Sequence, residues 1–435
     1  MAKPSWTAIR GALPALGLIL LAACAAQGKL EARHARSGFV TPAPAADFAG
    51  YIAQAKAQIA AANAAIGTPL EPKVIEARAP FELRPEGARC RRAADGRYRR
   101  AALLIHGLGD TPYQMRDLGE RFAAACYLVR AILLPGHGTV PGDLLGIGDS
   151  AWIEATRQGA ASFAGEAERL YLVGFGAGAA LALDYAEGEA AANAPPLGGL
   201  VLLAPALARP GGPGLFANGF LGFGPPGAAD GFVQLLPEDD PVRYLSIARD
   251  ARTQLGALID ELDARRHLLA LPVFLALSAD DATIDAPAAR RWFCGQLLGP
   301  RALVWYASGP GPADDCRFVL PRASDRWPGV LDLAHRALPI APDDPHYGLA
   351  GDYVDCAHYY WQTDTPDWLI CQDPVKTPAN STVRYGEITR QNLAAHVMRR
   401  LTFNPDFDAL ATAILEFLAA QRRSSPPVPS LKPAA

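Results

Sequence analysis

The sequence predicts an α/β protein with a mostly parallel central sheet and helices on both faces of that sheet. Short, almost wholly apolar segments bounded by Gly, Pro or charged residues recur along the chain, and amphipathic stretches lie between several of them. The strands of a covered parallel sheet are buried on both faces, so they form continuous apolar runs. With 435 residues, of which 50% are hydrophobic, the chain is long enough for one large domain or two ordinary ones and is not a disordered polymer.

The predicted strands are compact apolar runs, and the predicted helices have either an Ala-rich or an amphipathic pattern. The strands are expected at 101–105, 128–134, 170–175, 199–203, 273–277 and 302–306. Helices are expected at 47–66, where Asp47 is the expected N-cap, and at 115–125, 152–167, 177–187 and 286–298.

The charge balance argues against nucleic acid as a partner. The chain has 41 Lys and Arg against 44 Asp and Glu, with a net charge of -3 and no long basic run. No phosphate-binding loop, HExxH motif or calcium loop is present, so we expect neither a cofactor nor a metal.

The first residues have the pattern of an export signal. Lys3 and Arg10 precede an apolar run over 11–23, which is about as long as a signal-peptide core and short for a membrane span. The run ends in Leu-Ala-Ala-Cys at 21–24, which resembles the lipobox of bacterial lipoproteins. This resemblance implies that 1–23 are removed, that Cys24 carries a lipid anchor to the membrane, and that the protein lies in the bacterial cell envelope. Because no Asp follows Cys24, the implied membrane in a Gram-negative cell is the outer one. An ordinary signal peptide or anchor helix is the alternative.

With Cys24 set aside, six of the seven cysteines remain for disulfides, which persist in oxidising compartments. Proximity in the sequence favours Cys356–Cys371 and Cys294–Cys316 and leaves Cys90–Cys126. Other pairings and free buried thiols remain open.

The domain organisation follows from changes in composition. Residues 24–80 are expected to form a tether and an N-terminal helix, 81–423 one α/β domain, and the Pro-rich 424–435 a disordered tail. Within the domain, 207–246 is rich in Gly and Pro and holds several Phe residues, which fits either a mobile apolar cap over a pocket or an irregular surface loop. Long irregular stretches at 308–330 and 341–385 carry cysteines, as functional or disulfide-linked loops often do. The Phe residues are Phe216, Phe220, Phe223 and Phe232.

Three glycine motifs follow apolar segments in order: HGLG at 106–109, PGHG at 135–138 and GFGAG at 174–178. Over about residues 95–420 the chain resembles the α/β-hydrolase superfamily, above all bacterial carboxylesterases, monoacylglycerol-lipase-like and serine-aminopeptidase-like enzymes. In that superfamily G-x-S-x-G makes a sharp corner between strand and helix that exposes the nucleophilic Ser. The resemblance implies that the backbone N–H groups of Leu108 and Ala177 form the oxyanion hole.

The sequence departs from that pattern at the nucleophile, because the Ser position is occupied by Gly176. Glycine has no side-chain atom that can attack a carbonyl carbon. Ser150 lacks the second glycine and follows no strand, whereas Ser278 ends a predicted strand and is expected to be structural. The corner contains no Cys or Asp that could replace the hydroxyl.

The other two members of the catalytic triad have candidates in the expected chain order. Asp281, which lies in a loop after a predicted strand, is the expected acid, with Asp280 and Asp285 as alternatives; a solvated acidic loop is the other interpretation. His335 is the expected histidine, at the end of a predicted apolar strand over 329–334. The competing histidines are His346 and His358.

Three functions remain open. Loss of a triad member typically lowers turnover by about a millionfold. The first function is therefore a protein of esterase or lipase ancestry with weak or absent Ser-dependent hydrolysis, which binds an acyl ester, a lipid or a protein. The second is an active hydrolase or lyase in which His335 and Asp281 activate water. The third is a non-catalytic scaffold of the envelope.

Overall fold

The structure is a computed structural model. It describes residues 30–45, 47–208, 231–265, 268–309, 316, 318–360, 363, 365–373 and 383–424. The predicted signal peptide, Cys24, residues 209–230 of the predicted cap and the tail from 425 lie outside these ranges. Among the residues described, no helix combines the length and apolar character that a membrane span requires.

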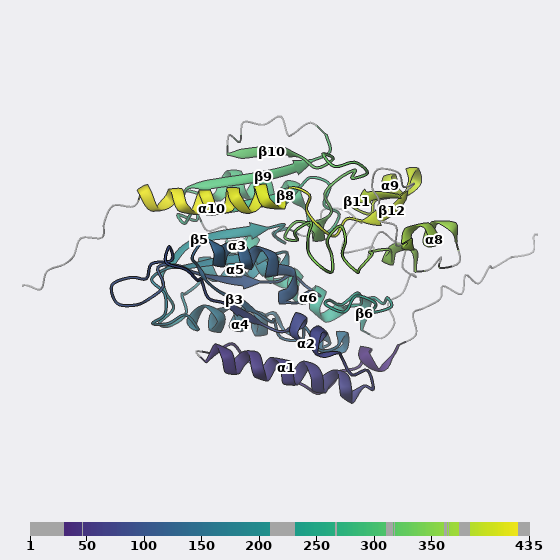
Figure 1. Ribbon diagram of the computed structural model, residues 1–435, viewed down its shortest axis with the longest axis horizontal. Coiled ribbons are helices and arrows are strands. Elements are labelled where there is room, and N and C mark those ends of the chain that lie inside the picture. Colours follow the sequence, from purple (N-terminus) through teal and green to yellow (C-terminus); the bar gives the residue numbers. More distant parts are fainter. Residues whose placement is uncertain are drawn as a thin grey trace, which may run out of the picture.

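A sheet of eight strands forms the centre of the molecule, in the order β1-β3-β2-β4-β5-β8-β9-β10 (Figure 1). β1 pairs with β3 in an antiparallel manner, and every other neighbouring pair is parallel. The prediction of a mostly parallel sheet is therefore confirmed. The strands are β1 (Phe81–Leu83), β2 (Ala101–Ile105), β3 (Leu128–Ile132), β4 (Leu170–Phe175), β5 (Leu197–Leu203), β8 (Val273–Ser278), β9 (Arg301–Ala307) and β10 (Val319–Ala323).

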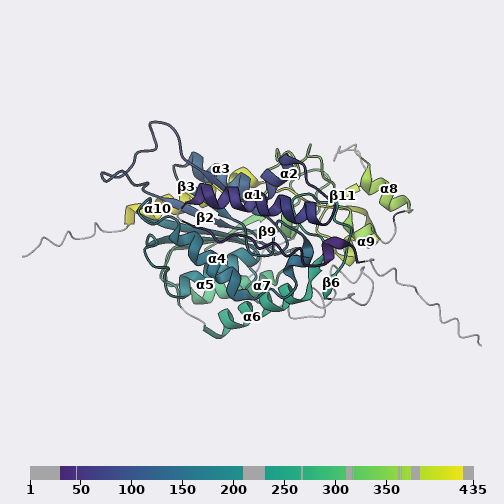
Figure 2. The same ribbon diagram turned by 90° about the horizontal axis from the view of Figure 1, so that it is seen from below.

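Helices cover both faces of this sheet, as Figure 2 shows. α3 (Arg116–Ala124) and α10 (Phe407–Ser424) lie on one face, and α4 (Asp149–Ala161), α5 (Ala177–Glu187), α6 (Arg249–Arg265) and α7 (Ala286–Gln296) lie on the other. α1 (Phe48–Ala65) packs beside β1 and α2 (Pro72–Arg78). The carboxylate of Asp47 accepts a hydrogen bond from the Gly50 amide (3.0 Å), so the predicted N-cap of α1 is confirmed.

A set of smaller elements gathers at one end of the sheet (Figure 1). β6 and β7 form an antiparallel pair, and β11 and β12 form a parallel pair. Four of these elements lie between β10 and α10 in the sequence, and α8 and most of β11 fall within the irregular stretch predicted at 341–385. Their bounds are β6 (Phe232–Gln234), β7 (Ile247–Ala248), α8 (Pro366–Gln372), β11 (Val383–Gly386), α9 (Arg390–Ala395) and β12 (Val397–Arg400).

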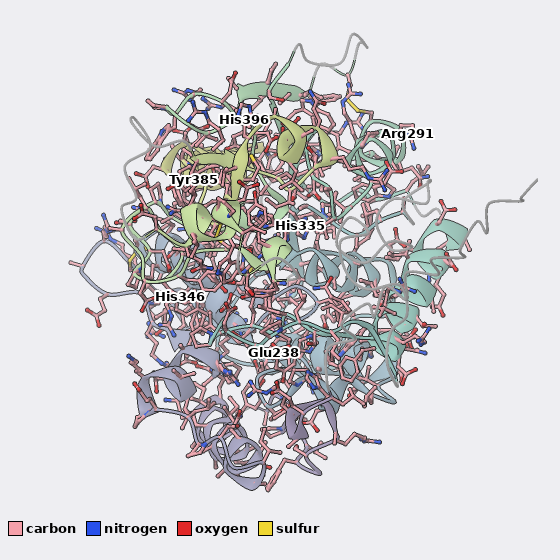
Figure 3. All side chains as sticks on the ribbon, turned by 90° about the vertical axis from the view of Figure 1, so that its right-hand side faces the viewer. Glu238, Arg291, His335, His346, Tyr385 and His396 are labelled. Carbon is pink, nitrogen blue, oxygen red and sulfur yellow. A yellow bond between two sulfur atoms is a disulfide. The ribbon has the colours of Figure 1, made fainter. Side chains whose placement is uncertain are left out.

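The predicted strand that leads to His335 is wrong. Only Val330 in this segment makes a bridge, to Tyr385, and His335 itself opens a short 3-10 helix, His335–Ala337. The segment hydrogen-bonds to the neighbourhood of β11 through Leu331 N–H and the Tyr385 carbonyl (2.8 Å), rather than to the main sheet, which ends at β10. Figure 3 labels His335, His346 and Tyr385 in this part of the molecule.

The three expected disulfides are confirmed. Cys90–Cys126, Cys294–Cys316 and Cys356–Cys371 have Cα–Cα distances of 5.1, 6.1 and 6.1 Å. The first joins the loop before β2 to the residues after α3, the second joins α7 to the segment before β10, and the third joins the 3-10 turn at 357–359 to α8. Cross-links of this kind hold irregular loops in place where an apolar core cannot.

Arg130 is a charged residue within the otherwise apolar strand β3. Its side chain is 1% exposed and lies between two carboxylates: Nε donates to Glu82 (2.7 Å) and Nη2 donates to Glu166 (2.6 Å). The guanidinium also stacks over Phe48 and Phe163, each 4.8 Å from the ring centre. Arg130 thereby connects β1, α1 and the segment after α4 to the sheet.

We expect Arg130→Leu to lower the free energy of unfolding by about 3–5 kcal/mol, because it leaves two partly buried carboxylates without their buried cation. The matched control is Arg84→Leu, since Arg84 pairs with the same two carboxylates but is 52% exposed. That change should cost less than about 1 kcal/mol. Urea unfolding of both variants measures the difference, and equal losses would contradict this account of Arg130.

Candidate active site

The candidate site lies where the carboxyl ends of neighbouring parallel strands meet. A cavity of about 180 Å³ opens there, and its walls include the corner after β4, the loop after β2, the loop after β8 and the 3-10 helix at His335. Ligand sites of open α/β sheets occupy this edge. The lining residues used below are Leu108, Gly176, Ala177, Arg243, Arg252, Leu255, Thr283, Ile284 and His335.

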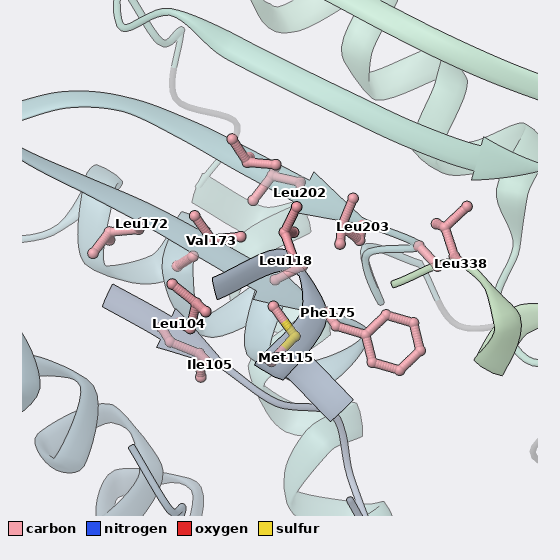
Figure 4. Close-up of a cluster of buried hydrophobic side chains, with 14 of the residues drawn as sticks. Leu104, Ile105, Met115, Leu118, Leu172, Val173, Phe175, Leu202, Leu203 and Leu338 are labelled. Atoms are coloured by element: carbon pink, nitrogen blue, oxygen red, sulfur yellow. The ribbon is translucent and has the colours of Figure 1, made fainter. Parts of the chain in front are cut away.

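The corner at Gly176 has the backbone geometry of a nucleophile elbow. Gly176 has φ 55° and ψ -114°, a conformation that side-chain-bearing residues rarely adopt. Its N–H donates to the Leu203 carbonyl (3.0 Å), and α5 begins at the next residue. The close-up in Figure 4 shows the buried side chains of β4 and β5 beneath the corner, among them Val173, Phe175 and Leu203.

The glycines on either side of Gly176 are required by close packing. A Cβ at Gly178 would lie 2.2 Å from the Ile105 carbonyl oxygen, and one at Gly174 would lie 2.3 Å from the Gly178 carbonyl oxygen. These distances are far below ordinary contact, so α5 can lie against the end of β2 only with glycine at these positions. The G-x-x-x-G spacing thus follows from the geometry of the corner, with or without a serine at its centre.

His335 and Asp281 lie together, and they face Gly176. The Nδ1 atom of His335 is 2.6 Å from Oδ2 of Asp281, whose side chain is fully buried. Oδ1 of Asp281 accepts the N–H groups of Thr283 (2.6 Å) and Ile284 (3.0 Å), which fixes the carboxylate. A Cβ built on Gly176 would lie 3.6 Å from Nε2 of His335, an ordinary contact. A hydroxyl on that carbon would be within hydrogen-bond reach of Nε2.

The alternative acids and histidines have other partners. Asp280 accepts hydrogen bonds from Ser308 and Ser324, and the Asp285 carboxylate caps α7 through Ala288 N–H (2.8 Å). His346 contacts Asp240 and Asp352, and Nε2 of His358 lies 3.2 Å from the Met398 carbonyl. None of these four residues is among the described residues that line the cavity.

The two serines considered as replacements lie elsewhere. Ser150 is exposed in the first turn of α4, and the Ser278 hydroxyl accepts the Asp280 N–H (3.2 Å). Among the described lining residues, Thr283 has the only hydroxyl, and it belongs to the same loop as Asp281.

The loop that carries Leu108 is held by two buried histidines. The Gly109 N–H donates to Nε2 of His137, and the Leu134 N–H donates to Nε2 of His106, both at 3.0 Å. Burial lowers the pKa of His106 to about 4 and that of His137 to about 3, so both rings remain neutral acceptors at neutral pH. The HGLG and PGHG motifs therefore fasten to each other and set the position of Leu108. The N–H groups of Leu108 and Ala177 donate to no acceptor that the described residues supply.

The described part of the predicted cap contributes to the wall of the cavity through Val233, Leu236 and Leu245. Phe232 is fully buried and packs edge-on against His34, with ring centres 5.3 Å apart. Phe216, Phe220 and Phe223 lie outside the described residues.

Across the described ranges, no group of three or more His, Cys, Asp and Glu side chains is placed to hold a metal ion.

Glu387 is a buried residue of the site that sequence reasoning missed. Oε2 accepts the His335 N–H (3.1 Å) and lies 3.4 Å from the Ala282 amide, while Oε1 accepts Nε (2.8 Å) and Nη2 (2.6 Å) of Arg400. The side chain is fully buried. One carboxylate thus joins the acid loop, the backbone of the histidine and β12. Nothing in the local sequence indicates this role, since Glu387 is 52 residues from His335.

We expect Glu387→Gln to lower the free energy of unfolding by about 3 kcal/mol, because it removes the negative charge that pairs with buried Arg400. The variant should also broaden or shift the downfield ¹H resonance of the His335 Nδ1 proton, since the His335 N–H loses a charged acceptor. Glu261→Gln, which alters an exposed pair with Arg265, is the control and should change neither property. An unchanged resonance in Glu387→Gln would show that Glu387 does not position His335.

The parallel sheet with an antiparallel first strand, the left-handed corner after β4 and the His–Asp pair beyond β8 together define an α/β-hydrolase fold.

Comparison with known proteins finds lipolytic enzymes among those similar to this chain. The chain is 26% identical over 185 residues to the thermostable monoacylglycerol lipase of Bacillus sp. (strain H-257), which covers 42% of this chain and 70% of that protein. No family model matches the chain. Solved structures that are similar include one from work on LipS and LipT, two metagenome-derived lipolytic enzymes (19% identity, TM-score 0.41, 52% of this chain and 86% of that chain). Another is the monoacylglycerol lipase of Paleococcus ferrophilus (19%, 0.39, 52% and 88%). The chain therefore has an α/β-hydrolase fold, and over those 185 residues its sequence is similar to that of a monoacylglycerol lipase.

Proposed function

We propose that this protein is a lipid-anchored envelope member of the superfamily that binds an acyl ligand in the cavity and has lost Ser-dependent ester hydrolysis. The observation that carries the proposal is Gly176, a residue without a nucleophile, in a corner where a Cβ would lie 3.6 Å from Nε2 of His335. The apolar walls of the cavity, the two unused backbone donors and the lipolytic relative support an acyl ligand.

The absence of a serine hydroxyl oxygen at residue 176 accounts for the proposed loss of acyl-enzyme formation. In a serine hydrolase, His takes the proton of the Ser hydroxyl while its oxygen forms a bond to the carbonyl carbon, and the oxyanion hole binds the negative oxygen that results. Here Asp281 and His335 could accept that proton, and Leu108 and Ala177 could donate to that oxygen. No atom at residue 176 can form the bond to carbon. The acyl-enzyme cannot form at this position, whereas binding of the acyl group requires no such atom.

We expect the wild-type protein to turn over p-nitrophenyl butyrate slowly, and Gly176→Ser to raise turnover by at least roughly 100-fold, toward an upper limit near a millionfold. The new hydroxyl would meet His335, which is already hydrogen-bonded to Asp281. Labelling by a fluorophosphonate should appear only in Gly176→Ser. High wild-type activity, or labelling of the wild type, would show that the chain has a nucleophile elsewhere.

Two further variants separate the hydroxyl from the Cβ that carries it. Gly176→Ala should remain inactive, and it should lose about 1–3 kcal/mol of stability, as should Gly176→Ser, because φ is 55° at this residue. Adding His335→Ala to Gly176→Ser should remove the gained activity. If Gly176→Ala gained activity as well, the effect would come from the altered backbone and not from the hydroxyl.

A second candidate function is hydrolysis by water, and the intact His335–Asp281 hydrogen bond of 2.6 Å favours it. Nε2 of His335 would take a proton from water while the water oxygen adds to the ester carbonyl, and the same proton would then pass to the leaving alkoxide. This mechanism predicts a slow wild-type activity that His335→Ala abolishes and Thr283→Val leaves unchanged. An activity that survives His335→Ala excludes it.

A further inference from the structure

The described lining of the cavity has more positively charged than negatively charged residues. Four arginines and two aspartates are among its described lining residues. Arg336 pairs with Asp240 (3.1 Å) and with Asp355 (2.5 Å), both of which are buried. Arg400 pairs with Glu387 (2.6 Å). These two cations are therefore neutralised within the protein and serve its structure.

Arg252 differs from the other arginines. It lies in the first turn of α6, partly buried, with no carboxylate within 4.0 Å and no acceptor for its side chain in the part of the chain that the structure describes. Burial and the neighbouring Arg249 lower its pKa, and no acidic residue opposes this shift. A cation in this position gains most from an anion that enters the cavity.

Arg243 is paired, but its hydrogen-bonding capacity is not filled. Its Nε lies 3.6 Å from Oδ1 of Asp110, an ion pair that is longer than a hydrogen bond. The buried Nε and Nη1 atoms have no hydrogen-bond partner among the described residues. A buried donor without a partner is costly, so a second acceptor in the cavity would stabilise the folded protein.

The wall near Arg252 is apolar. Leu255 follows Arg252 by one helical turn, and Leu236, Leu245, Ile247 and Ile284 complete this part of the lining. The cavity therefore offers a cationic group next to a surface suited to an alkyl chain. A neutral ester would use the apolar wall and leave the charge of Arg252 unpaired.

We propose that the acyl ligand is an amphiphilic carboxylate, whose anionic group pairs with Arg252 while its alkyl chain lies against the apolar wall. This inference rests on the proposed function, because it specifies the ligand of the same cavity. It adds the charge of the ligand, which the elbow and the lipolytic relative do not indicate.

Calorimetric titration of the purified full chain with octanoate and with octanamide tests the proposal, since the two probes share one acyl chain and differ in charge. We expect octanoate to bind at least about tenfold more tightly, as charge-assisted hydrogen bonds predict. Arg252→Gln should reduce octanoate affinity to that of octanamide. The matched control, Arg249→Gln, changes an exposed arginine of the same helix that does not line the cavity, and it should leave both affinities within about twofold.

The possible outcomes distinguish failure of the anionic-ligand proposal from failure of the proposed acyl-binding function. Equal binding of octanoate and octanamide by the wild type and by Arg252→Gln would overturn the anionic ligand and leave acyl binding intact. Equal loss of octanoate binding in Arg252→Gln and Arg249→Gln would reduce the preference to general positive charge and overturn the role of Arg252. Binding of neither probe by a folded wild type would overturn the proposed function itself. Thermal unfolding confirms that both variants are folded.

Discussion

The nucleophile elbow at the centre of the candidate site depends on the close approach of α5 to the end of β2, which the glycines of the corner allow. With Gly178 against the Ile105 carbonyl and Gly176 at φ 55°, the chain turns sharply from a buried strand into a buried helix. This turn brings residue 176 close to both Gly107 and His335, since a Cβ on Gly176 would lie 3.7 Å from the Gly107 Cα and 3.6 Å from Nε2 of His335. None of these contacts involves a hydroxyl, and glycine adopts the required φ without steric cost. The architecture of a nucleophile elbow is therefore independent of its nucleophile.

The His335–Asp281 pair likewise has structural contacts that do not require a nucleophile. Asp281 also accepts two amide hydrogen bonds from its own loop, and the His335 backbone is held by Glu387, whose charge neutralises Arg400. Removal of either acidic group would leave buried donors or a buried cation without a partner, which destabilises the fold. Both residues thus have a structural role that does not depend on catalysis. Their presence agrees with a binding protein as well as with a hydrolase.

The parts of the structure that could be predicted from the sequence are those in which local pattern and long-range packing agree. β2 and β4 are apolar throughout, α5 is rich in Ala and Leu and lies between Gly176 and Gly188, and cysteines close in sequence are bonded in space. β10 was not predicted because it is a partly exposed edge strand, and its Pro321 and Arg322 interrupt the apolar pattern used to identify the other strands. The strand expected before His335 is absent because the backbone of this segment bonds to Tyr385 of β11 and not to the main sheet. Glu387 and Arg252 could not be identified, since each acquires its environment from residues far along the chain.

The positive charge of the cavity bears on which ligand it can bind. The N–H donors of an oxyanion hole are oriented toward negative charge that develops only during reaction. If Ser-dependent hydrolysis is lost, as we propose, residue 176 forms no bond to the carbonyl carbon, and that charge does not develop on a bound neutral ester. The backbone donors, Arg252 and the two Arg243 nitrogens that make no hydrogen bond within the described residues nevertheless remain, and together they favour negative charge in the ground state. Such an environment discriminates most strongly in favour of a ligand whose charge is permanent, because the interaction is then present throughout binding rather than only at a transition state.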